Sequence, residues 1–85
     1  MNQFDYLVRE QLKTMDKLLY LQSEIERCEE IKEQLNQLQD EAKAESVQFE
    51  IEQMRLQLYQ IQHMFEKQTE EVIRTYQNQK VETVS

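Results

Sequence analysis

Residues 47–72 read VQFEIEQMRLQLYQIQHMFEKQTEEV and contain the clearest pattern in the chain. Apolar residues recur there at alternating steps of four and three, interrupted by Gln68: Val47, Ile51, Met54, Leu58, Ile61, Phe65 and Val72. Ala44 and Thr75 extend the series in phase, so this stripe is about 45 Å long on an α-helix at 1.5 Å per residue. A stripe of this kind requires a second helix to cover it.

A second apolar series precedes the first and has a different phase. Its members are Leu21, Cys28, Ile31, Leu35 and Leu38. Continued in the same phase it would reach Phe49 and Leu56 instead of Val47, so the register changes near residues 39–46. This segment lacks large apolar residues, and both Asp40 and Ser46 are possible N-caps. We therefore predict a helix over about 3–38, a turn over about 39–45, a second helix over about 46–79 and a frayed tail over 80–85. The alternative is a stutter within one long continuous helix, paired as a coiled-coil dimer.

The composition restricts the chain to one all-α domain over residues 1–85. It contains 0 Gly and 0 Pro, whereas average usage would give about 10 of the two combined. Those residues supply tight turns and left-handed backbone positions. The chain is instead rich in Gln, Glu, Lys, Leu and Met, which lose little rotamer freedom in a helix. We expect an antiparallel two-helix hairpin of the coiled-coil type.

The first twenty-five residues carry more apolar surface than a hairpin can bury. At 100° per residue their apolar members cover about half of the helix circumference, and the simplest cover for the excess is another copy of the chain. We therefore expect two hairpins to pair into a dimeric four-helix bundle. The candidate dimer or partner interface consists of Phe4, Val8, Leu12, Met15, Leu19, Phe49 and Leu56.

Charge and cysteine content exclude several classes of partner and location. The net charge is −7, which disfavours nucleic-acid phosphates and anionic lipid surfaces as partners. No apolar run approaches the roughly 20 residues that a membrane-spanning helix requires, and the N-terminus lacks the features of a signal peptide. Cys28 is the single cysteine and has no partner for an intrachain disulfide. We expect a cytoplasmic protein.

No group of residues indicates a catalytic, cofactor or metal site. His63 is the single histidine and falls on the solvent side of the second helix. Cys28 occupies an apolar position, where a free cysteine usually acts as a small hydrophobe. Four glutamates, at positions 26, 29, 30 and 33, share a face but lack the Glu-x-x-His units of bundle metal sites. We expect no enzymatic activity, no cofactor and no small-molecule substrate.

Two segments resemble a known family. They are Leu18, Leu19, Leu21 to Glu24 and Glu26 to Cys28 in the first helix, and FEKQTEEVIRTY at positions 65–76 in the second. In these the chain resembles the YgaB-like family of small coiled-coil proteins from Bacillus and relatives. The resemblance implies helices and a cytoplasmic bacterial setting, and it implies no activity.

These observations predict a non-catalytic protein–protein interaction module that self-associates and serves as an adaptor or regulator. One alternative is a peripheral membrane protein, because Arg9, Lys13 and Lys17 lie opposite the apolar arc of the first helix. Asp5, Glu10 and Asp16 counter that charge. A further alternative is a chaperone-like or scaffold coiled coil.

Overall fold

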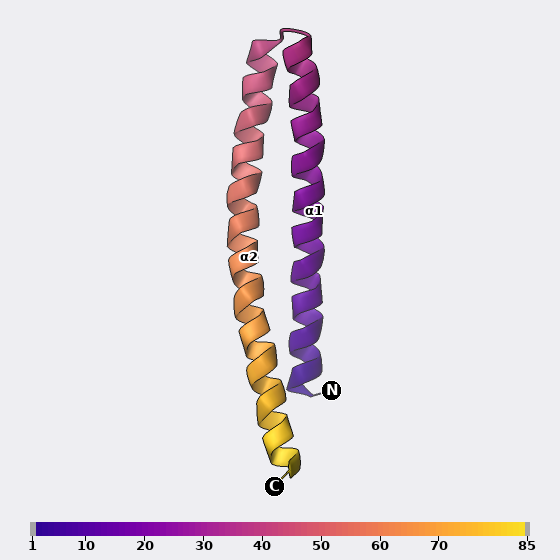
Figure 1. Cartoon of the computed structure of the whole chain (residues 1–85), viewed down its shortest axis with the longest axis vertical. Coiled ribbons are helices and arrows are strands. Elements are labelled where there is room, and N and C mark those ends of the chain that lie inside the picture. Colours follow the sequence, from indigo (N-terminus) through magenta and orange to yellow (C-terminus); the bar gives the residue numbers. More distant parts are fainter. Residues whose placement is uncertain (1, 85) are drawn as a thin grey trace.

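The computed structural model describes the backbone of residues 2–84 and the side chains of residues 2–79. Helix α1 (Gln3–Gln37) and helix α2 (Glu41–Val84) lie side by side and run in opposite directions (Figure 1). The molecule measures 69 × 16 × 15 Å, which is close to the length of α2 alone. The prediction of an all-α antiparallel hairpin is confirmed, and the single continuous helix is not formed. The pairing of two hairpins stays a prediction.

The reversal between the helices is a Schellman turn without glycine. Gln39 has φ 59°, in the left-handed region. The amide of Asp40 donates to the carbonyl of Leu35 at 2.9 Å, and the amide of Gln39 donates to that of Asn36 at 3.0 Å. These two bonds define the motif, which usually has glycine at the left-handed position. The chain therefore reverses at a site where the sequence carries no glycine signal.

Asp40 starts the second helix immediately after the turn. Its side-chain Oδ1 accepts a hydrogen bond from the amide of Lys43 at 3.2 Å, which is the action of an N-cap. Helix α2 consequently begins at Glu41, earlier than the start near residue 46 that the sequence pattern placed. Of the two possible caps, Ser46 lies inside the helix. The turn shortens accordingly, since α1 ends at Gln37.

The start of α1 and the end of α2 lie at the end of the hairpin opposite the turn. At the start of α1, Oδ1 of Asn2 accepts from the amide of Asp5 at 2.8 Å, so this helix is capped by a side chain. Helix α2 continues to Val84 through most of the segment expected as a tail over 80–85. Of that segment, Ser85 and the side chains of 80–84 lie outside the described residues.

The core lies along the single seam between the helices. Ile51 is its most buried residue, with 1 % of its surface exposed. It packs with Ile25 and Cys28, and the half-buried Val47, Met54 and Leu58 surround this cluster. Ala44 is buried near the turn, where a small side chain allows the helices to approach.

The structure assigns the expected seam residues to different degrees of burial. Cys28 and Ile51 are buried, and the following are half-buried: Leu21, Ile31, Leu35, Val47, Met54, Leu58, Ile61, Phe65 and Val72. Leu38 is the exception, because 76 % of its surface is exposed. Leu38 is the C-cap of α1, which ends at Gln37. Because the backbone leaves the helix at this point, the seam does not continue to Leu38.

The seam of α1 also includes residues that apolar spacing alone did not assign to it. Leu18 and Ile25 are buried, as is Thr14. All three belong to one heptad series through the whole helix: Leu7, Gln11, Thr14, Leu18, Leu21, Ile25, Cys28, Lys32 and Leu35. The polar members conceal this series from a search for apolar residues. A search for four–three spacing that tolerates polar members would have found it.

A polar layer interrupts the core near the end of the hairpin opposite the turn, which we call the open end. The side-chain amide of Gln11 donates to the hydroxyl of Thr69 across the two helices. The Thr14 hydroxyl donates to the carbonyl of Glu10 at 3.2 Å. Oε1 of Gln68 is buried and has no hydrogen-bond partner within the described residues. Polar groups in a helical seam cost stability and favour one register over shifted ones.

The left-handed backbone at Gln39 predicts that glycine stabilises the hairpin at this position. A side chain with a Cβ is strained in that region, so Gln39→Gly should raise the free energy of unfolding by about 0.5–1 kcal/mol. Thermal unfolding followed by circular dichroism measures the change. The exposed Gln53, inside α2, is the matched control, because Gln53→Gly should lower stability. Equal destabilisation by both substitutions would contradict this account of the turn.

The seam predicts opposite outcomes for two nearby leucines of α2. Leu58 packs against the buried cluster, so Leu58→Asp places a charge in the core and should unfold a hairpin this small. Leu56 is exposed, so Leu56→Asp should retain the helical circular dichroism of the unaltered chain. Retained helicity and an unchanged melting temperature in Leu58→Asp would show that the seam is not the core.

Candidate protein interface

A second apolar stripe runs along α1 beside the seam. It consists of Val8, Leu12, Met15 and Leu19, and we refer to these four residues as the apolar stripe. Each member directly follows a seam residue, so the apolar stripe is rotated by about 100° from the seam. Leu12 is 61 % exposed and Leu19 56 %. Helix α2 therefore leaves the apolar stripe largely uncovered.

Cross-helix contacts show which side of the hairpin this stripe faces. Glu29 and Arg55 also directly follow seam residues, and Arg55 donates a hydrogen bond to the Glu29 carboxylate. Residues that follow the seam in either helix therefore share one side of the molecule. On α2 this rule places the exposed Tyr59, Ile73 and Tyr76 on the same side as the apolar stripe.

Phe4 and Tyr76 close this side at the open end of the hairpin. Their ring centroids lie 5.8 Å apart and the ring planes are tilted by 47°, within the range of favourable aromatic pairs. Phe4 is half-buried by this contact. It therefore belongs to the edge of the face, and the apolar stripe forms its centre.

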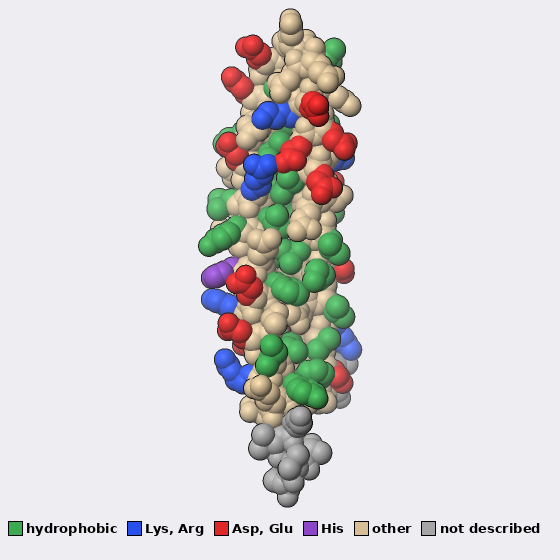
Figure 2. Space-filling view, viewed as in Figure 1, with side chains coloured by type: hydrophobic (Ala, Val, Ile, Leu, Met, Phe, Trp, Pro, Cys, Tyr) green, Lys and Arg blue, Asp and Glu red, His purple; other side chains and the backbone are tan. Residues whose placement is uncertain are grey.

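Charged and apolar side chains are distributed differently in the two halves of the molecule. On the face drawn in Figure 2, hydrophobic side chains gather along the middle of the half nearer the N-terminus, with charged side chains at its edges, whereas acidic and basic side chains also lie across the middle of the half nearer the turn. In the half nearer the turn, Arg27 donates to Glu24 at 2.9 Å, and this hydrogen bond raises the pKa of Arg27. The candidate interface is thus confined to one half of one side.

The structure separates the members of the interface that the sequence suggested. Val8, Leu12, Met15 and Leu19 share one face. Phe49 and Leu56 are exposed but lie one position further around α2 than the residues that follow the seam. They also lie nearer the turn, because the helices are antiparallel. The structure thus does not bring Phe49 and Leu56 to the apolar stripe, because of their rotation around α2 and the antiparallel alignment of the two helices.

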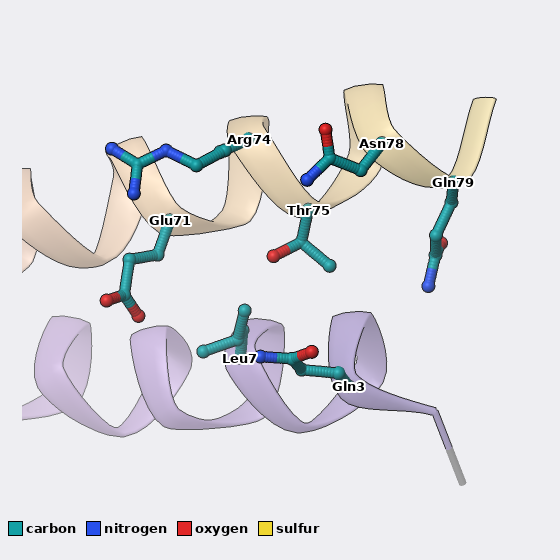
Figure 3. Close-up of a pocket in the computed structure, with 7 residues that line it drawn as sticks. All are labelled: Gln3, Leu7, Glu71, Arg74, Thr75, Asn78 and Gln79. Carbon is teal, nitrogen blue, oxygen red and sulfur yellow. The ribbon is translucent and has the colours of Figure 1, made fainter. Parts of the chain in front are cut away.

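A pocket lies at the open end of the hairpin, on the side opposite to the apolar stripe. Its volume is about 440 Å³, and its lining consists of Gln3, Leu7, Glu71, Arg74, Thr75, Asn78 and Gln79. Figure 3 shows Leu7 and Thr75 facing each other across it, whereas Arg74 extends along its own helix. The lining offers three side-chain amides, the carboxylate of Glu71, the guanidinium of Arg74 and the hydroxyl of Thr75.

The remaining reactive residue types are accounted for by packing and surface contacts. Cys28 is buried in the seam. The exposed His63 stacks on Tyr59 with the ring planes 10° apart, and its Nδ1 lies 3.6 Å from the carboxylate of Glu66. Within the part of the chain that the structure describes, no group of three or more His, Cys, Asp or Glu is placed to hold a metal ion. Neither described helix has the length and apolar character needed to cross a membrane.

Comparison with known proteins identifies the family. The chain belongs to the family described as YgaB-like protein, whose profile matches residues 3–79. It is 51 % identical over 78 residues to the "Uncharacterized protein YgaB" of Bacillus subtilis (strain 168). The aligned residues make up 92 % of this chain and 68 % of the relative. No solved structure matches. The family resemblance predicted from the sequence is confirmed, and it extends over both helices.

Proposed function

We propose that this YgaB-like chain is a non-catalytic protein–protein interaction module that self-associates through the apolar stripe and acts as an adaptor or regulator. The observation that carries the proposal is the exposure of Leu12, Met15 and Leu19 in one line beside a completed seam. Contiguous exposed apolar side chains in a soluble protein usually mark an interaction site. A cytoplasmic location, expected from the sequence, is part of the same proposal.

The hairpin seam does not account for the apolar stripe. Helix α1 contributes one series of side chains to its contact with α2, and that series already runs from Leu7 to Leu35. The stripe repeats the four–three spacing of the seam over residues 8–19. This spacing is the one that fits the side chains of another helix. A helical occupant is therefore favoured over an irregular peptide.

A membrane surface is a poorer occupant for the same face. Asp5 is exposed and lies one heptad before Leu12, in the column that continues the stripe. A carboxylate at this place would enter the headgroup region of a bilayer, where basic residues are normally found. The charge on the face thus favours a protein partner. Liposome flotation distinguishes the two, because a stripe buried between proteins leaves the chain in the lipid-free fraction.

The proposal predicts that a charge in the stripe separates the assembly without unfolding it. Leu12→Asp should reduce the sedimenting mass from twice the chain mass to the chain mass, because the carboxylate cannot be buried against apolar side chains. Its helical circular dichroism should be retained, since Leu12 lies outside the seam. Sedimentation equilibrium over a range of protein concentrations measures the mass.

Tyr6 is the matched control for this substitution. It is exposed on α1 and directly precedes a seam residue, so it faces the other side of the hairpin. Tyr6→Asp should leave the mass at twice that of the chain. An unaltered chain that sediments as a monomer at every concentration would overturn the proposal, as would a folded Leu12→Asp dimer.

A further inference from the structure

We propose that the apolar stripe is covered by the same stripe of a second copy, with the two α1 helices antiparallel and a two-fold axis between Leu12 and Met15. The inference rests on the self-association proposed above and adds which helices meet, in which direction and at which residues. Most homodimers have such a two-fold axis, and the same surface patch then contributes from both copies. The stripe must therefore be complementary to itself.

An antiparallel arrangement makes the stripe self-complementary. It places Leu12 opposite the second copy's Met15 and Val8 opposite the second copy's Leu19. The next layer outward places Asp5 opposite the second copy's Gln22, whose side-chain amide is a suitable donor to a carboxylate. Each layer occurs twice by symmetry. Four apolar layers are thus enclosed by one polar layer at each end.

A two-fold arrangement that stacks α1 of each copy on α2 of the other is less favourable. When two hairpins stack on this side about an axis parallel to the helices, α1 of one copy lies on α2 of the other. Residues with the same number in the two copies then lie at the same height along the axis. Leu12 and Met15 would consequently lie against polar residues that follow the seam in α2, namely Gln62, Glu66 and Thr69. That arrangement leaves the leucine and methionine side chains without apolar partners, whereas the antiparallel arrangement buries them against each other.

Two of the charges that flank the stripe favour the antiparallel pairing. A third, Lys13, directly follows Leu12 and lies near its own counterpart at the axis, but it is paired with Glu10 of its own helix at 3.2 Å. Arg9 and Asp16 are exposed and directly follow Val8 and Met15. Neither takes part in an ion pair or hydrogen bond among the described side chains. The same two-fold axis places Arg9 close to the second copy's Asp16, and Asp16 close to the second copy's Arg9. Two opposite-charge pairs thus form from residues that the hairpin itself leaves unused.

Helix α2 and the size of the contact are consistent with the same arrangement. Residues 2–25 of the two α1 helices overlap over about 36 Å, and with a hairpin two helices wide the interface would bury roughly 1,200 Å² in total, at the lower end of specific interfaces. The same axis brings Ile73 to the level of the second copy's Tyr59, and both are exposed in the hairpin. The two turns then project from opposite ends of the dimer.

Complementary charge reversal tests the pairing. Arg9→Glu alone and Asp16→Lys alone each create two like-charge pairs, so each variant should dimerise about tenfold more weakly than the unaltered chain. An equimolar mixture of the two variants restores both opposite-charge pairs and should form a mixed dimer of nearly unaltered affinity. Sedimentation equilibrium measures the affinities, and native mass spectrometry identifies the mixed dimer by its mass.

Lys17→Glu is the control for net charge. Lys17 directly precedes a seam residue and faces away from the stripe, and the substitution changes the charge by the same amount as Arg9→Glu. It should leave the dimer affinity within about twofold of that of the unaltered chain. Circular dichroism of all variants verifies that the hairpin is folded.

The outcomes separate this inference from the proposed function. If the unaltered chain dimerises and Leu12→Asp separates it, but the mixture shows no recovery, self-association stands and the antiparallel α1 pairing is wrong. Equal weakening by Lys17→Glu and Arg9→Glu also overturns the pairing, because the effect would then follow net charge alone. A chain that never dimerises removes both proposals.

Discussion

The structure depends on burying one narrow apolar column between two helices that otherwise carry polar side chains. Within the hairpin, each helix can bury apolar side chains only against the other helix. Isolated helices gain little stability from their own hydrogen bonds in water. The buried apolar cluster of Ile51, Ile25 and Cys28 lies in the part of the hairpin nearer the turn. Towards the open end the column contains Gln11, Thr14 and Gln68, so the packing there is more polar.

This gradient along the seam places the exposed apolar surface where the hairpin itself is least apolar. The polar layer and the apolar stripe occupy the same half of α1, since Leu12 and Met15 directly follow Gln11 and Thr14. At these two positions of the seam, α1 presents a polar side chain to α2 and a larger apolar side chain to the side of the hairpin. In the half nearer the turn the seam is apolar except for Lys32, and the flanks carry charges such as Glu29 and Arg55.

Most carboxylates of the described residues lie on solvated helix faces, whereas Cys28, Gln11 and Gln68 lie in the seam. The match to the YgaB-like family extends over both helices and so includes the seam and the stripe together.

The sequence alone determined the class, the hairpin and most of the seam of α2, because heptad spacing is a local property that residues such as Ile51, Leu58 and Phe65 display directly. The family was likewise recognisable from two short segments. The start of α2 was not, since Asp40 and Ser46 are equally good caps by residue type and the choice depends on a left-handed Gln39 that no glycine marks. Tertiary structure also decided that Leu18 and Ile25 belong to the seam, that Leu38 does not, and that Phe49 and Leu56 lie away from the apolar stripe. Those assignments depend on the relative rotation and alignment of two helices, which are set by packing across the seam and are not encoded in either helix alone.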